Sequence, residues 1–389
     1  MAQFGDFTVD RNSTKYVLGS GGTIISYATD EPAFEFNADG SYKGLLVEPA
    51  ATNICLQSED LSTSWAVGSN ATVTANDTTA PDGNTTADKL GDNSATGTGF
   101  VYVQQSISVA ANTKYTASVF LKADQLSFAR LEAVGYAAIS GHQYFGLSGS
   151  GSLGTASNLD DSKIEAYPNG WYRCSVTWTQ GAADTEFKFR IYVANSISSS
   201  TVDLDNTSSI FAWGVQVELG ANASSYIPTT TTSVTRNADD ISNTSASTYV
   251  GQTAGTVYVE ATIDNIIANK NIITVSDGTD DNIVRITFNA NADMRMYVKG
   301  GTTSIINDVE TIVAGTYKFA IVYSGSDTRV YRDGVQLSSS TTSLTFTSSV
   351  DEIDIGQSFA GTGQSNNWIR AFAFYKRALT DTEAISLTS

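Results

Sequence analysis

The ten residues KYTASVFLKA at positions 114–123 decide the fold class of this chain. Apolar side chains recur at every second position along them, which is the period of an extended strand with one buried face. The residues expected on that face are Tyr115, Ala117, Val119 and Leu121. The stretch EFKFRIYVA at 186–194 repeats the alternation, so we predict that β-strands dominate the fold.

Outward from these two stretches, strands alternate with turns rich in Gly, Asn and Ser along residues 55–228, and a second such series fills residues 243–389. No helical crossover pattern separates the strands, so each series predicts an antiparallel β-sandwich. The stretch LTDTEAISL at 379–387 predicts the one short helix, with Thr380 as N-cap and Glu383 completing a capping box.

The chain length supports two domains, because 389 residues exceed the roughly 250–300 residues that one hydrophobic core serves. We therefore predict an all-β protein with two tandem antiparallel jelly-roll β-sandwiches, at 55–228 and 243–389. A short lead segment at 1–54 precedes them, and we expect it to dock on the following domain. A Thr-rich linker at 229–242 is expected to run extended between the two cores.

The composition narrows the class of partner. Hydrophobic residues make up 41% of the chain and charged residues only 16%, a balance typical of extracellular β proteins whose polar surface comes from Ser, Thr, Asn and Gly. Forty acidic and 22 basic residues give a net charge of −18, which repels phosphate and anionic lipid. Neither nucleic acid nor membrane insertion is expected.

Export and redox chemistry give two further expectations. The start MAQFGDFTVDRNS lacks the pattern of a secretory signal, and a protein of extracellular character without one is typical of a virion, which leaves the cell by lysis. Cys55 and Cys174 leave two states open: a disulfide, or two free buried thiols, which assembly in a reducing cell favours.

Two stretches near the C-terminus resemble a known domain family. TRVYRDGVQL at 328–337 is similar to a hairpin, and WIRAFAFYKRALTDTEA at 368–384 to the closing strand and short helix, of the laminin-G-like (concanavalin-A-like) jelly roll. The resemblance covers about 140 residues and implies that fold for the second domain.

The middle of the chain resembles the carbohydrate-binding-module-like domain of phage tail and head fibre proteins. The stretches that carry this resemblance are NICLQSEDLSTSW at 53–65, NGWYRCSVTW at 169–178 and FAWGVQVELGANASSYIPT at 211–229. It implies a structural protein at the virion surface, a fibre or spike that contacts other virion proteins, commonly as a homotrimer, and binds host-surface glycans. Two alternatives stay open: a capsid decoration or head fibre with a mainly structural role, and a polysaccharide depolymerase.

The residues argue for binding over catalysis. His142 is the only histidine, no GxSxG motif accompanies it, and two cysteines with one histidine cannot form a local zinc site. We therefore predict that the protein is not an enzyme.

Aromatic residues are the candidates for glycan contact, because aromatic rings stack on the apolar faces of sugars. Those nominated are Trp65, Trp171, Tyr136 and Tyr144. The alternative is that these rings fill a core or cap a sandwich edge, as we expect for Trp178 and Trp213 within their strand patterns.

Calcium is the candidate cofactor, in a structural role, because sandwich domains of both resembled types often hold such an ion and hard cations take oxygen ligands from loops. The candidate ligands are Asp277, Asp280 and Asp281 in SDGTDDN, with Asp82 and Asn84 as a weaker second group. The alternative is that they are ordinary solvated turn residues.

Overall fold

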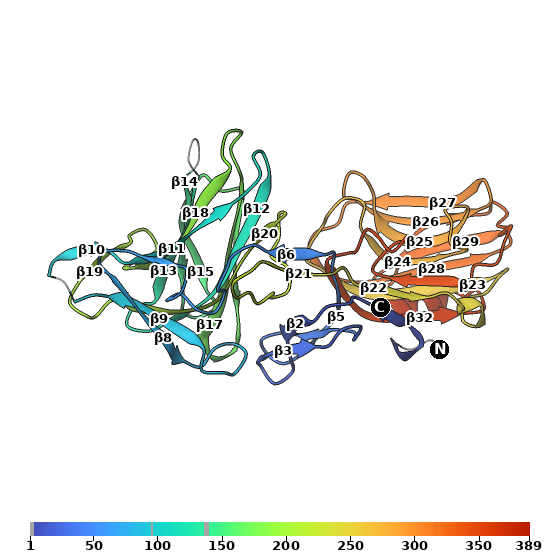
Figure 1. Ribbon diagram of the computed structural model, residues 1–389. Coiled ribbons are helices and arrows are strands. Elements are labelled where there is room, and N and C mark those ends of the chain that lie inside the picture. The colour runs from blue at the N-terminus through green and yellow to red at the C-terminus, as the bar shows by residue number, and fades with distance from the viewer. Residues whose placement is uncertain (1–3, 95, 136–139) are drawn as a thin grey trace.

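The computed structural model describes residues 4–94, 96–135 and 140–389 (Figure 1). Two β-sandwiches lie side by side, and the N-terminal hairpin β2 (Lys15–Leu18) and β3 (Ile24–Tyr27) lies beside their junction. All the strand pairs of the described residues are antiparallel, and their single α-helix is α1 (Asp381–Thr388). The predicted all-β class with two sandwich domains is confirmed.

The middle sandwich consists of two six-stranded sheets. The first has the order β15 (Ser152–Ser157), β14 (Ser140–Gly146), β13 (Phe128–Gly135), β18 (Glu186–Ala194), β11 (Tyr102–Ser108) and β7 (Ala66–Val67). The second has the order β16 (Asp161–Ala166), β17 (Trp171–Thr179), β12 (Lys114–Ala123), β20 (Ser209–Leu219), β9 (Ala87–Asp92) and β8 (Ala71–Thr78). The pair β10 (Thr98–Phe100) and β19 (Thr201–Asp203) stands apart from both.

The alternation that predicted the strands also explains the middle core. Tyr115 and Leu121 of β12 and Phe187 and Val193 of β18 all belong to one buried cluster between the sheets, together with the residues that alternate between them. The predicted faces of both strands are therefore confirmed. Trp178 belongs to the same cluster, as expected.

Strand β20 departs from this period at one residue. Ala212 and Val215 both face the middle core, although they lie three positions apart. Between them Gly214 has a φ of 66°, and the pairing of β20 with β12 shifts register there, which is a β-bulge. Trp213 is buried as expected, at 1% exposure, but it lies in a second core cluster, separate from the one between the two sheets.

The C-terminal sandwich consists of two seven-stranded sheets. One has the order β1 (Thr8–Asp10), β22 (Asp240–Asn243), β31 (Glu352–Ile355), β24 (Asn271–Ser276), β25 (Asn282–Phe288), β26 (Met294–Gly300) and β27 (Thr303–Glu310). The other has the order β30 (Val335–Ser340), β29 (Asp327–Arg332), β28 (Gly315–Ser324), β23 (Gly255–Ile263), β32 (Asn367–Tyr375), β5 (Tyr42–Val47) and β4 (Phe34–Phe36).

The lead segment does not join the domain that follows it in sequence. Its strand β1 pairs with β22, and its strand β5 pairs with β32, so both extend sheets of the C-terminal sandwich. Leu45 and Val47 alternate into that sandwich's core, which supplies the reason. The expected docking on the middle domain holds for the hairpin β2–β3, where Tyr16 forms a bridge with Tyr226, and for Asn53, whose amide donates to the carbonyls of Val215 and Ile227.

The linker is also more structured than expected. It contains β21 (Val234–Arg236), which pairs with β6 (Ala51–Asn53) between the two sandwiches, and the beginning of β22 (Figure 1). Arg236 and Asp239 are buried at 2% and 1% exposure, so buried charges hold this segment, which we expected only to run extended between the two cores.

The predictions of the helix cap, the hairpin turn and the free thiols are confirmed. Thr380 caps α1 and forms the capping box with Glu383. Asp333 and Gly334 both have positive φ, as a tight hairpin turn requires, and they join β29 to β30. Cys55 and Cys174 are free and buried. None of the described helices is long and apolar enough to cross a membrane.

Candidate functional site

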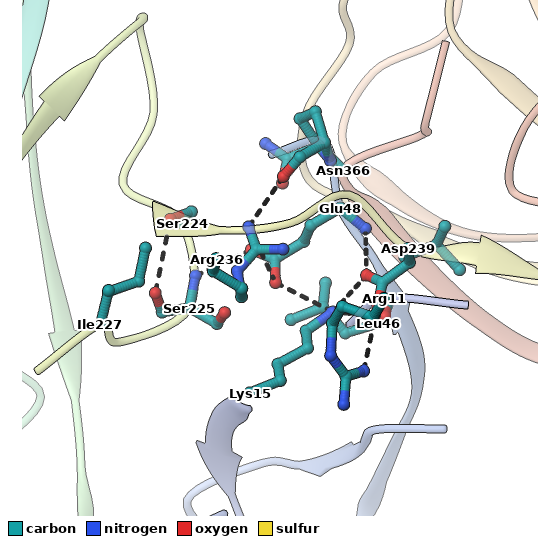
Figure 2. Close-up of polar contacts among 12 residues, drawn as sticks. Arg11, Lys15, Leu46, Glu48, Ser224, Ser225, Ile227, Arg236, Asp239 and Asn366 are labelled. Carbon is teal, nitrogen blue, oxygen red and sulfur yellow. Dashed lines mark hydrogen bonds and ion pairs between the residues drawn. The ribbon is translucent and has the colours of Figure 1, made fainter. Parts of the chain in front are cut away.

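A buried ionic network lies where the lead segment, the linker and the middle domain meet (Figure 2). The Lys15 ammonium lies 2.6 Å from Asp239 Oδ2 and 3.0 Å from Glu48 Oε2, and it also donates to the carbonyl of Leu46 at 2.7 Å. Glu48 Oε1 accepts a 2.8 Å hydrogen bond from the backbone N–H of Ser225. The network therefore links all three segments.

Two arginines complete the network. Arg11 contacts Asp239 at 3.2 Å, and Arg236 lies 3.7 Å from Glu48 (Figure 2). Burial alone would raise the pKa of Glu48, but the charges of Arg236 and Lys15 lower it to about 2. Glu48 is thus held as a carboxylate, and the network fixes strand β2 at the junction.

The fixed hairpin β2–β3 forms one wall of a cavity of about 360 Å³. The wall comes from Tyr16, Ile24, Ile25 and Ser26. The opposite side is formed by the middle domain residues Glu59, Asp82, Asn84, Trp213 and Tyr226.

A second cavity, of about 500 Å³, begins at the same Glu59. Its polar lining includes Gln57, Asp60, Asn76, Thr86, Asp88, Thr229 and Thr230. We call these two cavities, with Glu59 common to both, the trough. Its two parts have volumes in the range of small-molecule sites, about 300–1,000 Å³.

Aromatic rings form the floor of the first part of the trough. The Trp213 and Tyr226 ring centroids lie 4.6 Å apart, and Tyr16 meets Tyr226 edge-on at 6.2 Å. Trp213 donates its indole N–H to Thr86 Oγ1 at 3.1 Å. The rings are therefore held in fixed orientations, although Trp213 and Tyr226 are only 1% and 3% exposed.

Glu59 is the central polar group of the trough. Burial, with the neighbouring charge of Asp82, raises its pKa, while the hydrogen bond from the Tyr226 hydroxyl at 2.9 Å opposes the rise. Since only Oε1 accepts from Tyr226, the other carboxylate oxygen is left to accept from a ligand.

Asp88 and Asp60, two further carboxylates of the trough, have structural roles. Asp88 accepts from the backbone N–H groups of Leu61 at 2.7 Å and Asn76 at 2.9 Å, and burial raises its pKa. Asp60 caps its own loop, accepting from the backbone of Ser62 at 2.8 Å. Glu59 is therefore the carboxylate best placed to contact a ligand.

A smaller cavity of about 90 Å³ lies between the two sandwiches and is lined by Glu35, Lys43, Arg173 and Trp368, among others. Trp368 donates its indole N–H to Glu35 at 2.6 Å and is covered by the Lys43 ammonium, 3.5 Å from its ring centre. This space suits a few water molecules, each of which occupies about 30 Å³ in the liquid.

The two nominated tryptophans lie beneath the trough. Trp65 is 6% exposed and donates to the carbonyl of Gln57 at 3.4 Å, and Trp171 is 1% exposed and donates to the carbonyl of Thr79 at 3.2 Å. Neither presents an open ring face in this structure. Both support residues of the trough, and their direct contact with a ligand stays a prediction.

Tyr144, the nominated tyrosine that the structure describes, lies in a different sheet from Trp171. Tyr144 is 6% exposed on β14 and lies 3.3 Å from the Ser200 hydroxyl. Tyr136 lies outside the described residues. The role of both in ligand binding stays a prediction.

The nominated calcium ligands are divided among other partners. Asp277 accepts from Asn282 and Ser348 at 2.6 Å each, and these hydrogen bonds outweigh burial and lower its pKa to about 2. Asp280 contacts Arg285 at 3.4 Å and Asp281 contacts Lys299 at 2.9 Å. Across 4–94, 96–135 and 140–389, no three His, Cys, Asp or Glu side chains gather as a metal site would need, and calcium here stays a prediction.

Sequence reasoning did not nominate Glu59 or Tyr226, and it assigned Trp213 to the core. A signal for them was present, because all three lie within the stretches 53–65 and 211–229 that resemble phage fibre domains. In the folded chain these stretches touch: Tyr226 lies 3.0 Å from the Ser58 hydroxyl and 2.9 Å from Glu59.

Comparison with known families identifies the second domain. Residues 235–384 match the model of the concanavalin A-like lectin/glucanases superfamily. The C-terminal sandwich is thus a concanavalin-A-like domain, as the stretches 328–337 and 368–384 predicted. No curated protein matches the chain in sequence.

Among solved structures the likenesses are weak. The Ruminococcus gnavus IT-sialidase CBM40 is 16% identical, covering 36% of this chain and 84% of that one, with a TM-score of 0.31. Domain 4 of a Geobacillus stearothermophilus extracellular arabinanase, solved with arabinotriose, is 12% identical, covering 43% and 82%, with a TM-score of 0.33. Trypanosoma rangeli sialidase is 9% identical, covering 77% and 60%, with a TM-score of 0.29.

Proposed function

We propose that this protein is a glycan-binding adhesin at the surface of a phage particle, and that the trough is its glycan site. The observation that carries the proposal is the meeting of stretches 53–65 and 211–229 at one cavity. These are the stretches that resemble phage fibre domains, and together they supply Glu59, Trp213 and Tyr226.

The chemistry of the trough suits a neutral sugar. Sugar hydroxyls need acceptors, which Glu59 and the amides of Gln57 and Asn76 provide, and the hydroxyls of Thr86 and Thr230 can donate or accept. The hairpin side chains Ile25, which is 39% exposed, and Tyr16 offer apolar contact beside these groups. Pockets that combine apolar walls with a few placed polar groups are typical of small-molecule sites.

The virion role explains the remaining properties of the chain. Attachment through other virion proteins would place several copies on one particle, and a homotrimer would multiply weak sites into strong adhesion without new contacts. The buried network at Lys15 would hold the two domains rigidly, so that linked sites keep their geometry.

Binding of the purified chain to host cells and to a glycan array tests the proposal. We expect saturable binding to host envelopes that a soluble oligosaccharide displaces, and weaker binding by the variant Glu59→Gln. Absence of binding to every host envelope and every arrayed glycan would overturn the adhesin.

A mass census of separated heads and tails tests the virion assignment independently. We expect copies of this chain in one of the two fractions, and its absence from purified particles would contradict the assignment. Head-borne copies without glycan binding would identify the alternative of a capsid decoration protein. New reducing ends from host polysaccharide would identify the depolymerase.

A further inference from the structure

The outer face of the first C-terminal sheet carries two arginines side by side. Along β25 and β26 the residues Val284, Ile286, Met294 and Met296 face the core, which turns Arg285 and Arg295 outward by the strand alternation. In the register of the two strands, Arg285 pairs with Tyr297, and Arg295 lies directly opposite Thr287. The two guanidinium groups are therefore diagonal neighbours on one face.

Arg285 is incompletely satisfied. Its Nε is buried and has no hydrogen-bond partner, and its one carboxylate contact is Asp280 at 3.4 Å, a side chain 65% exposed. A buried guanidinium N–H without an acceptor is costly, because such donors lose water without replacing it. Burial also lowers the pKa of Arg285, and the charge of Arg295 adds to this.

Arg295 is equally short of a counter-charge. Its Nε donates to the amide oxygen of Asn307 at 2.5 Å, and its guanidinium lies 4.0 Å from the ring centre of Tyr297. Over the described ranges of the chain, Arg295 forms no ion pair. In a protein with 40 acidic residues and only 22 basic ones, two neighbouring cations that share a single carboxylate partner among the described residues are an unusual arrangement.

The two arginines line a cavity of about 480 Å³, which has room for one or two sugar residues. Its lining also includes Asn269, Asn271 and Thr362. Amides and hydroxyls bind sugar hydroxyls, while guanidinium forks match the planar oxygens of a carboxylate or sulfate.

We propose that this arginine groove, defined by Asn269, Asn271, Arg285, Arg295 and Thr362, binds the anionic substituent of an acidic saccharide. The anion would supply the hydrogen-bond acceptor that Arg285 Nε lacks and the negative charge that the two arginines lack. The groove would then complement the trough, whose carboxylate selects neutral sugars. The saccharide class rests on the proposed adhesin function, whereas the anion site itself rests only on the arginine pair.

Calorimetric titration of the full chain tests the groove. The probes are an oligogalacturonate, a sulfated dextran oligosaccharide and a neutral dextran oligosaccharide of matched length. We expect the oligogalacturonate or the sulfated dextran to bind at least about tenfold more tightly than the neutral probe. The affinity for that acidic probe should fall as the salt concentration rises. The probe that binds more tightly identifies carboxylate or sulfate as the preferred anion.

Variants localise the binding. Arg285→Gln and Arg295→Gln should each lower the affinity for the acidic probe about tenfold or more, since each removes a charge-assisted contact. Arg377→Gln, which removes the same charge from an exposed side chain paired with Glu383, should leave affinity unchanged. If Arg285→Gln does not fold, Arg295→Gln carries the test, with thermal unfolding as the check on folding.

Two outcomes would overturn the inference: equal affinity for acidic and neutral probes, or acidic-probe binding that neither arginine variant weakens. The trough variant Glu59→Gln separates this result from the proposed function. It should weaken binding of neutral glycans and leave acidic-probe binding intact, so failure of the groove and failure of the trough are distinguishable.

Discussion

The hydroxyl of Tyr226 lies 2.9 Å from Glu59 Oε1 and joins two segments that are 167 residues apart. Tyr226 also lies 4.6 Å from Trp213, ring centre to ring centre, so one side chain connects the carboxylate of the trough to its aromatic floor. The first prediction tests this carboxylate.

Replacing Glu59 by Gln should lower the affinity for a neutral glycan about tenfold, because a charged acceptor forms stronger hydrogen bonds than an amide of the same size. The fold should persist, since Gln can still accept from Tyr226. Titration calorimetry at pH 7 measures the effect. Glu165→Gln on exposed β16 is the control, and a comparable loss there would refute a specific role for Glu59.

Acidity should reproduce the Glu59→Gln effect in the wild type. Burial and the Asp82 charge raise the pKa of Glu59, so its carboxylate is lost as pH falls through a window lying above its ordinary value of 4.5. Neutral-glycan affinity should therefore decline in that window for the wild type and stay flat for Glu59→Gln. Parallel titration curves for the two proteins would disprove this assignment.

Removing the Lys15 ammonium should strongly destabilise the folded protein. The Lys15 side chain is 0% exposed, and Lys15→Ala leaves Asp239 and Glu48 without the cation that they share. We expect the free energy of unfolding to fall by about 3–5 kcal/mol. Urea denaturation measures it. Lys114→Ala removes an exposed ion pair with Asp160 and should cost no more than about 1 kcal/mol. Similar losses for both would mean that the network does not hold the junction.

Asp354 should make the protein less stable at high pH. Burial, and then the charge of Glu352, raises its pKa to about 8 from an ordinary 3.8, and its Oδ2 has no hydrogen-bond partner. Between these two values the folded state holds a proton on Asp354 that the unfolded state has lost. The stability that this group contributes is therefore fully present below pH 3.8 and is lost as pH rises toward 8.

The variant Asp354→Asn should escape this loss. Relative to the wild type it should gain at least about 1 kcal/mol of unfolding free energy between pH 5 and pH 8.5, measured by denaturant titration at both values. A stability difference that does not change between the two pH values would contradict a raised pKa at Asp354.

The bulge at Gly214 should be intolerant of a side chain. An alanine there would keep a φ of 66° and place its Cβ 3.0 Å from Phe120 and 3.2 Å from Tyr226, so we expect a loss of about 2–3 kcal/mol and weaker glycan binding. Gly149→Ala has a φ of 60° with nothing within 4 Å, and it isolates the backbone contribution of about 1–2 kcal/mol. Equal losses in the two variants would show that the rings do not press on this position.

Local patterns were enough to predict the secondary structure. The alternation from Tyr115 to Leu121 decides which side of β12 is buried, because successive side chains of a strand point to opposite faces. The Asp333-Gly334 turn and the Thr380 capping box follow from hydrogen bonds within four residues. These features depend on neighbours in sequence, and the sequence displays them directly.

The candidate site could not be predicted in the same way. Trp213 matched the core pattern of β20, but the bulge at Gly214 moved it to the opposite side, where it meets Tyr226 and the hairpin residue Tyr16. Trp65 and Trp171 looked like ligand platforms, yet they lie beneath the trough, because exposure depends on which distant segment covers a ring.

The sequence by itself determined the all-β class, the two sandwiches, the faces of their central strands and the capped final helix. The tertiary structure alone decided that the lead segment completes the C-terminal sheets, that Lys15 meets Asp239 across 224 residues, and that Glu59, Trp213 and Tyr226 form one cavity. The physical reason is range: strand periods and caps arise between adjacent residues, whereas sheet edges, buried charges and cavities arise only when remote segments exclude water together.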